Sequence, residues 1–231
     1  MKKKIAILLR GIPGSGKSYT ARLMLEKYGG GAPQDHIFST DAWFTRHVTE
    51  ARLDAEKRLA EAKADPEKSE TIALAIAENA TAEFYDEMEL EEYKKNWRGS
   101  CLGVAHEWNI QRYMDAVHRG VTPVIVDNTN VSANDCRGYV AIAEKNGYEV
   151  LIQEPTSPWW LDHAHMLTSK QKNGTALEDF ARFLAGFHQG MSEKYGTKGN
   201  QHGVPLDSIR KMIRRWQPNL TPDVIMGRVS K

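Results

Sequence analysis

The chain has 231 residues, which suits one large domain or a domain that carries an insertion. Apolar residues make up 41% and charged residues 26%, a composition typical of a folded globular protein rather than a disordered or membrane-spanning one. The net charge of +1 excludes a globally basic surface, so any contact with nucleic acid has to be local, at a strand end rather than along a duplex.

Residues 4–9 predict a short buried strand, because an apolar run follows the basic start of the chain. This run is too short for a signal peptide or a membrane span, and it ends at Arg10. Cys101 and Cys136 make neither a disulfide framework nor a metal cluster. We therefore expect a cytoplasmic protein.

A glycine-rich turn and a helix over 17–27 follow the first strand, and a second strand is predicted over 36–39. Residues 47–95 differ in composition, being rich in Ala, Glu, Lys and Asp, and they predict two or three helices that form an insertion or a helical flap. The acidic residues near its end are interpreted as a solvated helix face. They are Glu83, Asp86, Glu87, Glu89, Glu91 and Glu92.

The second half alternates further helices and strands. Ser132 and Asp135 form a capping-box pattern at the start of one of these helices, and Pro218 stops the chain after the last one. The predicted helices are 102–119, one that starts after Ser132, much of 159–196, and 206–216; the predicted strands are 122–126 and 148–153.

Strands that alternate with helices predict an α/β fold with a parallel sheet of about four to five strands flanked by helices. In such sheets, functional residues gather at the carboxyl ends of the strands. Three groups lie at such ends here: residues 11–18, Thr40 with Asp41, and residues 127–130. We expect these groups to lie along one edge of the sheet.

Residues 11–18, GIPGSGKS, match the pattern G-x-x-x-x-G-K-[ST] in full and predict the P-loop NTPase/kinase fold. The glycines allow successive N–H groups to form an anion nest, and the following helix adds its positive end. Lys17 is expected to bind the β- and γ-phosphates, while Ser18 offers a hydroxyl to Mg²⁺. The predicted cofactors are therefore ATP and Mg²⁺, bound by Gly11, Pro13, Gly14, Ser15, Gly16, Lys17, Ser18 and Tyr19.

Two aspartates are candidates for the acceptor side of a phosphoryl transfer. Asp41 follows the second strand and is expected to accept the proton of the acceptor hydroxyl; capping the next helix is the alternative role. Asp127 ends the third strand, where a Walker-B-type carboxylate assists Mg²⁺ or orients the acceptor. Asn128 and Asn130 are candidate substrate-binding residues, although turn chemistry explains them equally well.

Trp108 and Arg112 are four residues apart on a predicted helix and therefore share a face. Together with Arg98 they are a candidate cradle for a nucleobase or a single-strand end; core packing and a surface ion pair are the alternative. Trp159 and Trp160 are assigned to the core, and covering the base of the nucleotide is the alternative. No metal site, serine or cysteine triad, or paired H-x-[ST] phosphodiesterase element emerges.

Several segments together resemble the P-loop polynucleotide 5′-kinase family, and more closely the kinase-like domains related to phage polynucleotide kinase. They are GIPGSGKS, STDAWF, AHEWNIQR, VIVDNTNVS, EPTSPWW and NQHGVPLDSIRKMIRRW. The resemblance implies that Asp41 is the general base and that Asp127 begins the segment that places the acceptor. It also implies a lid at 197–204 that brings cationic groups, with Lys198 and His202 as its candidate residues.

The chain departs from this family at two positions. Phe44 stands where phage-type kinases carry an arginine for the phosphate of the acceptor, and Gly199 stands where related domains carry an arginine before the last helix. Lys198, Arg210 and Arg214 are candidate substitutes. Both departures weaken the expectation of a nucleic-acid 5′ end, and neither weakens that of a kinase.

The sequence thus predicts a single P-loop kinase domain over 1–231 that transfers the γ-phosphate of ATP to a hydroxyl, the 5′-OH of a nucleic-acid end being the first choice. A nucleoside, sugar or other small-molecule hydroxyl is the alternative acceptor. A nucleotide-binding regulatory module with little catalysis is a third possibility. No membrane partner is expected.

Overall fold

A computed structural model describes residues 3–51, 54, 57, 82–168, 174–186, 193–196, 200 and 202–229, with side chains of the 82–96 helix described from residue 87 onward. The chain divides into two compact units. The sheet unit comprises Met1–Ser39 and Glu107–Lys231, and the inserted unit comprises Thr40–His106. The predicted insertion at 47–95 falls within the inserted unit, and much of it lies outside the described residues.

The sheet unit is built on a parallel sheet of four strands in the order β2-β3-β1-β4. In this register Leu9, at the end of β1, lies opposite both Asp127 and Gln153. The carboxyl ends of these three neighbouring strands therefore meet at one edge, which confirms that residues 11–18 and 127–130 follow neighbouring strand ends. The predicted place of Thr40 and Asp41 along this edge stays a prediction. The strands are β1 (Ile5–Leu9), β2 (Ile37–Phe38), β3 (Val124–Asp127) and β4 (Glu149–Gln153).

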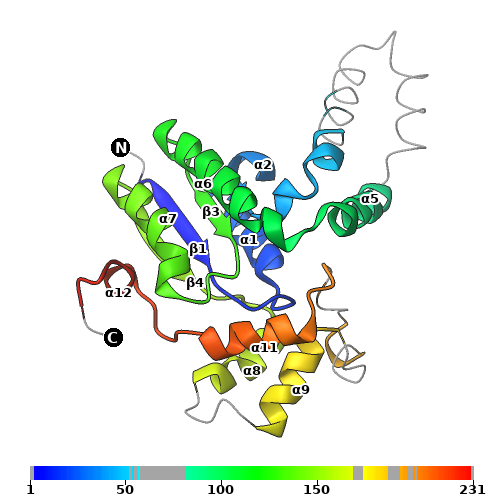
Figure 1. The fold of residues 1–231 in the computed structure, drawn as a ribbon. Helices are drawn as coiled ribbons and strands as arrows, with labels where there is room; N and C mark the ends of the chain where they lie inside the picture. Colours follow the sequence, from blue (N-terminus) through cyan, green and yellow to red (C-terminus); the bar gives the residue numbers. More distant parts are fainter. Residues whose placement is uncertain are drawn as a thin grey trace, which may run out of the picture. The chain divides into compact units, whose positions relative to one another are not determined.

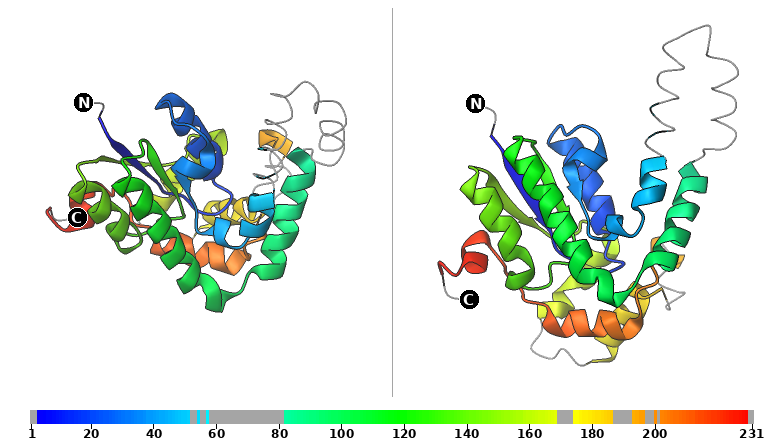
Figure 2. Two further views of the ribbon diagram at one scale, coloured as in Figure 1. Left: turned by 90° about the horizontal axis from the view of Figure 1, so that it is seen from above. Right: turned by 45° about the horizontal axis from the view of Figure 1, so that its top comes forward.

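Helices cover both faces of this sheet (Figures 1 and 2). Because side chains alternate along a strand, Ala6 and Leu8 of β1 pack with one set of helices, whereas Ile7 and Leu9 pack with another. The first face carries α6 (Leu102–His118), α7 (Ala133–Lys145) and α12 (Pro222–Met226), and the second carries α1 (Lys17–Lys27). A short helix, α2 (Pro33–His36), precedes β2.

A further helical cluster lies beside the carboxyl ends of the strands in Figure 1. Its core includes Trp160, Phe180 and Trp216, together with Ile12 from the glycine-rich loop. Burying Ile12 in this cluster ties the loop to these helices. They are α8 (Pro158–His163), the 3₁₀ segment η3 (Ala164–Thr168), α9 (Thr175–Leu184) and α11 (Leu206–Arg215).

The inserted unit has a small aromatic core formed by Phe44 and Tyr93 with Ala105. Phe44 is fully buried, and its ring meets those of Trp43 and Tyr93 edge to face at 5.0 and 5.5 Å. Its described elements are the 3₁₀ turn η1 (Asp41–Trp43), helical residues 46–51, α5 (Ala82–Asn96), the 3₁₀ turn η2 (Gly99–Cys101) and the first residues of α6.

The predicted elements agree with the structure within two residues for the four strands and for most helices. The capping box of Ser132 and Asp135 is confirmed at the start of α7. The assignment of 206–216 as the last helix was wrong, because α12 follows it. Thr221 caps α12 by accepting a hydrogen bond from the Val224 N–H, and Pro222 is its first residue. A capping threonine followed by a proline is a helix-start signal that the sequence already carried. Among the described residues, no helix is long and apolar enough to cross a membrane.

Candidate nucleotide-binding site

The loop of residues 11–16 joins β1 to α1 at the carboxyl edge of the sheet. The Arg10 N–H donates to the Gln153 carbonyl at 2.9 Å, and the Gly11 N–H donates to the Thr129 carbonyl at 3.0 Å. The loop therefore begins between the segments that follow β4 and β3. This placement brings the predicted phosphate loop next to Asp127.

Two glycines of the loop have conformations that other residues rarely adopt. Gly14 has φ 80° and Gly16 has φ 88°, both in the left-handed region. Space is equally restrictive, because a Cβ on Gly14 would lie 2.5 Å from the Leu184 carbonyl oxygen and one on Gly16 would lie 2.8 Å from Ser157 Cβ. Conformation and packing both require glycine at these positions.

The amino end of α1 has the features of an anion site. Gly16 is its N-cap, and no side chain among the described residues caps the helix, so the N–H groups of the first turn and the positive end of the helix point at the loop. Lys17 Nζ lies 3.2 Å from the Ile12 carbonyl oxygen, which places its ammonium over the loop. Ser18 and Tyr19 are exposed on the same turn. The N–H groups of the first turn, the Lys17 ammonium and the Ser18 hydroxyl together fit a polyphosphate group.

The segment after β4 supports the loop from the other side. Ser157 Oγ donates to the Ser15 carbonyl at 2.7 Å, and Trp159 Nε1 donates to the Gly14 carbonyl at 2.9 Å. The assignment of Trp160 to the core is confirmed, since it is 1% exposed. Trp159 packs against the same core but is only partly buried, and its indole N–H holds the loop.

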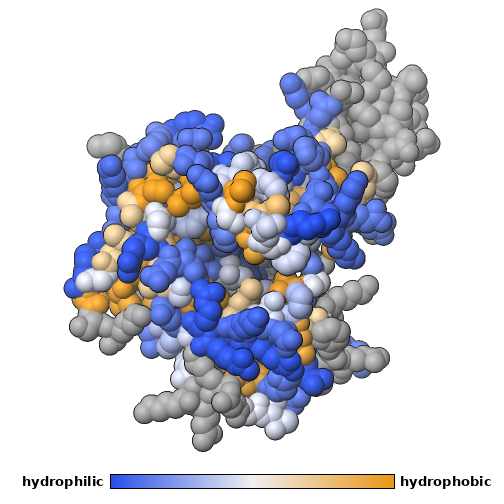
Figure 3. Space-filling view, in the orientation of Figure 1, coloured by the Kyte–Doolittle hydropathy of each residue, from blue (hydrophilic) through white to orange (hydrophobic). Residues whose placement is uncertain are grey.

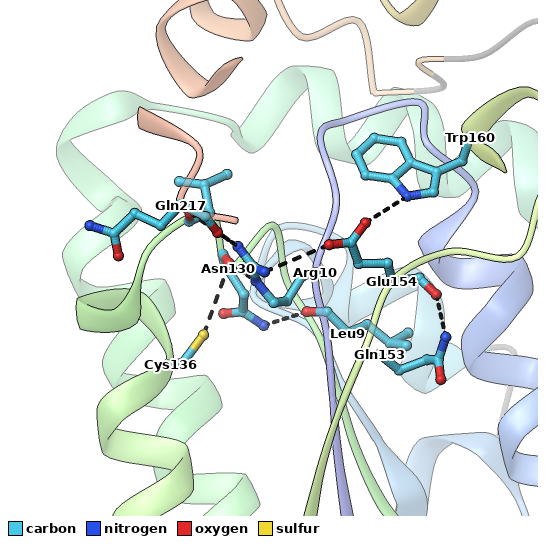
Figure 4. Close-up of polar contacts among 9 residues, drawn as sticks. Leu9, Arg10, Asn130, Cys136, Gln153, Glu154, Trp160 and Gln217 are labelled. Carbon is cyan, nitrogen blue, oxygen red and sulfur yellow. Dashed lines mark hydrogen bonds and ion pairs between the residues drawn. The ribbon is translucent and has the colours of Figure 1, made fainter. Parts of the chain in front are cut away.

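Arg10 is a residue of this site that the sequence analysis missed (Figure 4). Its side chain is 1% exposed and lies over the Trp216 ring at 4.2 Å. Nε donates to the Asn130 carbonyl at 3.0 Å, one terminal nitrogen donates to the Gln217 carbonyl at 2.5 Å, and the other lies 3.7 Å from Glu154 Oε1.

Burial lowers the pKa of Arg10, and the nearby Cys136, Glu154 and Asp135 oppose that shift. An arginine remains charged under these conditions, so a buried cation joins the ends of β1, β3 and β4 to the end of α11. The signal in the sequence was a charged residue directly after a buried strand, with Glu154 at the equivalent point of β4.

The polar residues after β3 are closely engaged with the protein. Asp127 is 8% exposed at the end of its strand. The backbone of Asn130 has φ 46°, and its side-chain amide donates to the Leu9 carbonyl at 2.7 Å. The Asn128 side-chain amide donates to Tyr139 Oη at 3.3 Å. The two asparagines therefore shape the turn next to the loop, and their contact with a substrate stays a prediction.

Trp108 and Arg112 share a face of α6, as predicted, with the guanidinium 4.5 Å from the indole ring. Arg112 also donates to the Gln34 carbonyl at 3.1 Å and lies 5.5 Å from the Phe38 ring. Burial lowers its pKa, and Asp35 opposes the shift. Arg112 thus connects α6 to α2 and β2, while its role in binding a strand end stays a prediction.

Two predicted site residues, Asp41 and Arg98, lie in the inserted unit. Asp41 begins η1 and accepts a hydrogen bond from Tyr93 Oη at 3.3 Å. Arg98 is exposed, and its guanidinium donates to the carbonyls of Lys95 and Trp97 at 2.9 and 2.7 Å. The predicted catalytic carboxylate is therefore held by α5, an interaction that the sequence analysis did not anticipate.

Only part of the predicted lid at 197–204 belongs to the described residues, and Lys198 lies outside them. His202 is exposed. Asn200 makes two hydrogen bonds to the backbone of Val204, and its backbone nitrogen lies 3.1 Å from the point where a Cβ on Gly14 would stand. Asn200 therefore lies against the phosphate loop.

The hydrophilic surface over α11 is continuous in Figure 3. Two arginines of α11 were candidate substitutes for the arginine that related domains carry at the position of Gly199. Arg210 is paired with Glu178 and Asp207, whereas Arg214 is exposed. The geometry makes Arg210 a structural residue of α11 and leaves Arg214 as the better candidate for contact with a ligand.

Curated proteins similar to the chain include a human and a rat protein. It is 28% identical to human NEDD4-binding protein 2 over 188 residues, which is 81% of this chain and 8% of that protein. It is 25% identical to rat 2′,3′-cyclic-nucleotide 3′-phosphodiesterase over 191 residues, which is 80% of this chain and 32% of that protein. The chain thus spans less than a third of the length of either relative.

Residues 7–161, more than half of the chain, match the AAA domain family. The match begins in β1 and ends in α8, so it includes the phosphate loop, Asp41 and the segment after β3. It agrees with the parallel sheet and with the glycine conformations of the loop. The chain belongs to the AAA domain family and has its P-loop α/β fold.

Proposed function

We propose that this protein is an ATP-dependent kinase that transfers the γ-phosphate to a hydroxyl, with the 5′-OH of a nucleic-acid end as acceptor. The observation that carries the proposal is the loop itself. Two left-handed glycines and the uncapped start of α1 make an anion nest, and the Lys17 ammonium lies over it.

In this proposal Lys17 and the loop amides bind the β- and γ-phosphates, and Ser18 and Asp127 are the residues that would hold Mg²⁺. The ion, when bound, supplies neutralisation of the charge on the phosphates. Asp41 accepts the proton of the acceptor hydroxyl late in the transfer. These roles require positioning and charge stabilisation rather than a covalent intermediate.

The choice of a nucleic-acid end is supported by the segments Asp127–Asn130 and His202–Pro205, which resemble those of polynucleotide kinases. A second candidate acceptor, the hydroxyl of a nucleoside, sugar or other small molecule, is supported by Phe44. This residue stands where the resembling kinases carry an arginine for the acceptor phosphate, and it is fully buried.

The test is transfer of label from γ-labelled ATP to a panel of 5′-OH oligonucleotides, nucleosides and small alcohols. We expect label on the oligonucleotides. Label on the small acceptors alone would transfer the assignment to the second candidate. ATP binding without label on any acceptor would favour a nucleotide-binding regulatory module.

Asp41→Asn provides the first testable prediction. The variant is expected to bind ATP as tightly as the parent, because Asp41 is not part of the loop, and to lose turnover by roughly 100-fold or more, because a general base contributes a factor of about 10²–10⁴. Isothermal titration with ATP and initial rates of label transfer measure the two effects. Lys17→Ala is the control, since it is expected to weaken ATP binding as well.

A further inference from the structure

Helix α5 of the inserted unit contacts the segment that carries Asp41. Four of its residues stand at positions i, i+3, i+4 and i+7 and therefore share one face of the helix: Glu89, Glu92, Tyr93 and Asn96. Each of them makes a hydrogen bond to the segment 41–49. The acidic run in this part of the chain was interpreted as a solvated face, and the structure corrects that interpretation for Glu89 and Glu92.

The contacts run along the helix in order. Thr49 Oγ1 donates to Glu89 at 3.4 Å, and the Val48 N–H donates to Glu92 Oε2 at 2.9 Å. Val48 lies in the first turn of residues 46–51, so the Glu92 carboxylate binds an N–H that has no partner within its own helix. These two contacts fix the chain just after the turn.

The other two contacts fix the turn itself. The Asn96 amide donates to the Phe44 carbonyl at 3.0 Å, directly after η1. Tyr93 Oη donates to Asp41 Oδ1 at 3.3 Å. The Tyr93 ring packs on Phe44 at 5.5 Å, so a phenylalanine would fill the same space without the hydroxyl that contacts Asp41.

We propose that Tyr93 is a positioning residue that orients the Asp41 carboxylate for proton transfer. The inference rests on the proposed function only in giving Asp41 a role in catalysis; the contact itself does not depend on it. Tyr93 is 5% exposed, and a carboxylate that accepts a hydrogen bond from a buried donor has fewer orientations to search before it accepts a proton.

Burial raises the pKa of Tyr93, and the charge of Asp41 and the hydrogen bond to it act in the same direction. The phenol therefore stays protonated and remains a donor at the pH where a kinase works. Of the charged and titratable groups of the inserted unit, Arg46 lies on the Trp43 ring at 4.4 Å and His106 Nδ1 lies 3.1 Å from Thr40 Oγ1.

The kinetic test is Tyr93→Phe, which keeps the ring and removes the hydroxyl. We expect kcat to fall by roughly tenfold, with KM for ATP and acceptor unchanged, because the group acts only in the transfer step. In an Asp41→Asn background the same substitution is expected to cause no further loss, since the two residues act as a pair. Equal losses in both backgrounds would overturn the inference.

Tyr148→Phe is the matched control. Tyr148 is also buried and donates to the Val121 carbonyl at 2.7 Å, but it lies in the sheet unit between α6 and α7. It is expected to lower stability without a selective fall in kcat. A fall in kcat of the same size in both variants would show that the effect of Tyr93→Phe comes from a general loss of stability, and it would overturn the proposal.

A spectroscopic test separates this inference from the proposed function. The ¹³Cζ resonance of Tyr93, assigned by its absence in Tyr93→Phe, is expected to shift in Asp41→Asn, because an amide is a weaker acceptor than a carboxylate. An unchanged resonance overturns the inference even if the protein is a kinase. A shift in a protein that labels no acceptor supports the contact and removes the kinase assignment alone.

Discussion

The loop at residues 11–18 and the turn at Asp41 are stabilised in different ways. The loop depends on main-chain conformation and on close packing within the sheet unit, with Gly14 and Gly16 in left-handed conformations. The turn depends on side chains of α5, which come from residues about fifty positions later in the chain, as the separation of 52 between Asp41 and Tyr93 shows.

The loop and the turn therefore differ in the substitutions that they tolerate. At Gly14 an added methyl group meets the backbone of Leu184, which cannot move aside, so this position is tightly restricted. In the turn the contacts come from exchangeable side chains on one helix face. The proposed nucleotide side thus depends on main-chain conformation and close packing, whereas the proposed acceptor side depends on side chains of α5.

The largest effect is expected from Phe44→Ala, which would separate the two regions most clearly. Removing a fully buried ring costs about 3–5 kcal/mol and leaves the inserted unit without its central aromatic residue. Hydrogen exchange should speed up over 87–106, while ATP binding at the loop is retained. Trp97→Ala, at a position that is 40% exposed, should change neither measurement.

A smaller effect is expected from Gly14→Ala. The left-handed conformation costs about 1–2 kcal/mol for a residue with a Cβ, and the clash with the Leu184 carbonyl adds to it. We expect ATP affinity, measured by titration, to fall about 100-fold, which corresponds to about 2.7 kcal/mol. Gly29→Ala is matched in backbone conformation, with φ 66°, but its Cβ meets nothing within 4 Å. Equal affinity losses in the two variants would contradict the packing argument.

The smallest of these effects is expected from Arg10→Met. It leaves three carbonyls and a half-exposed Glu154 without their cation, so a loss of about 1–2 kcal/mol in the free energy of unfolding is expected, below the cost of breaking a fully buried pair. Urea unfolding of the sheet unit measures it. Arg215→Met removes an ion pair that is 62% exposed on the arginine side and should cost under about 1 kcal/mol.

Much of the sheet unit could be predicted from the sequence because its signals are local. The G-x-x-x-x-G-K-[ST] pattern, the apolar strands and the capping box of Ser132 each involve neighbouring residues, and the structure confirms their elements. Helix α12 was missed although Thr221, Pro222 and Gly227 marked its ends, because Pro218 was taken as the end of helical structure.

The remaining contacts could not be predicted because they join distant parts of the chain. Arg10 meets Gln217 across a separation of 207 residues, and Trp159 meets Gly14 across 145. No periodicity reports such pairings. Lys198 and part of the predicted lid lie outside the described residues, so their roles stay predictions.

The pairing of Thr49 with Glu89 closes a loop of about 40 residues around the middle of the inserted unit. The entropy cost of joining two points of a chain rises by only about 0.6 kcal/mol for each doubling of the number of residues between them. A change in the number of residues between Thr49 and Glu89 is therefore expected to cost this contact little. Relatives with much longer or shorter insertions could therefore keep an Asp41-like turn in the same form, and an affinity tag placed between these two anchor points should leave phosphate transfer intact.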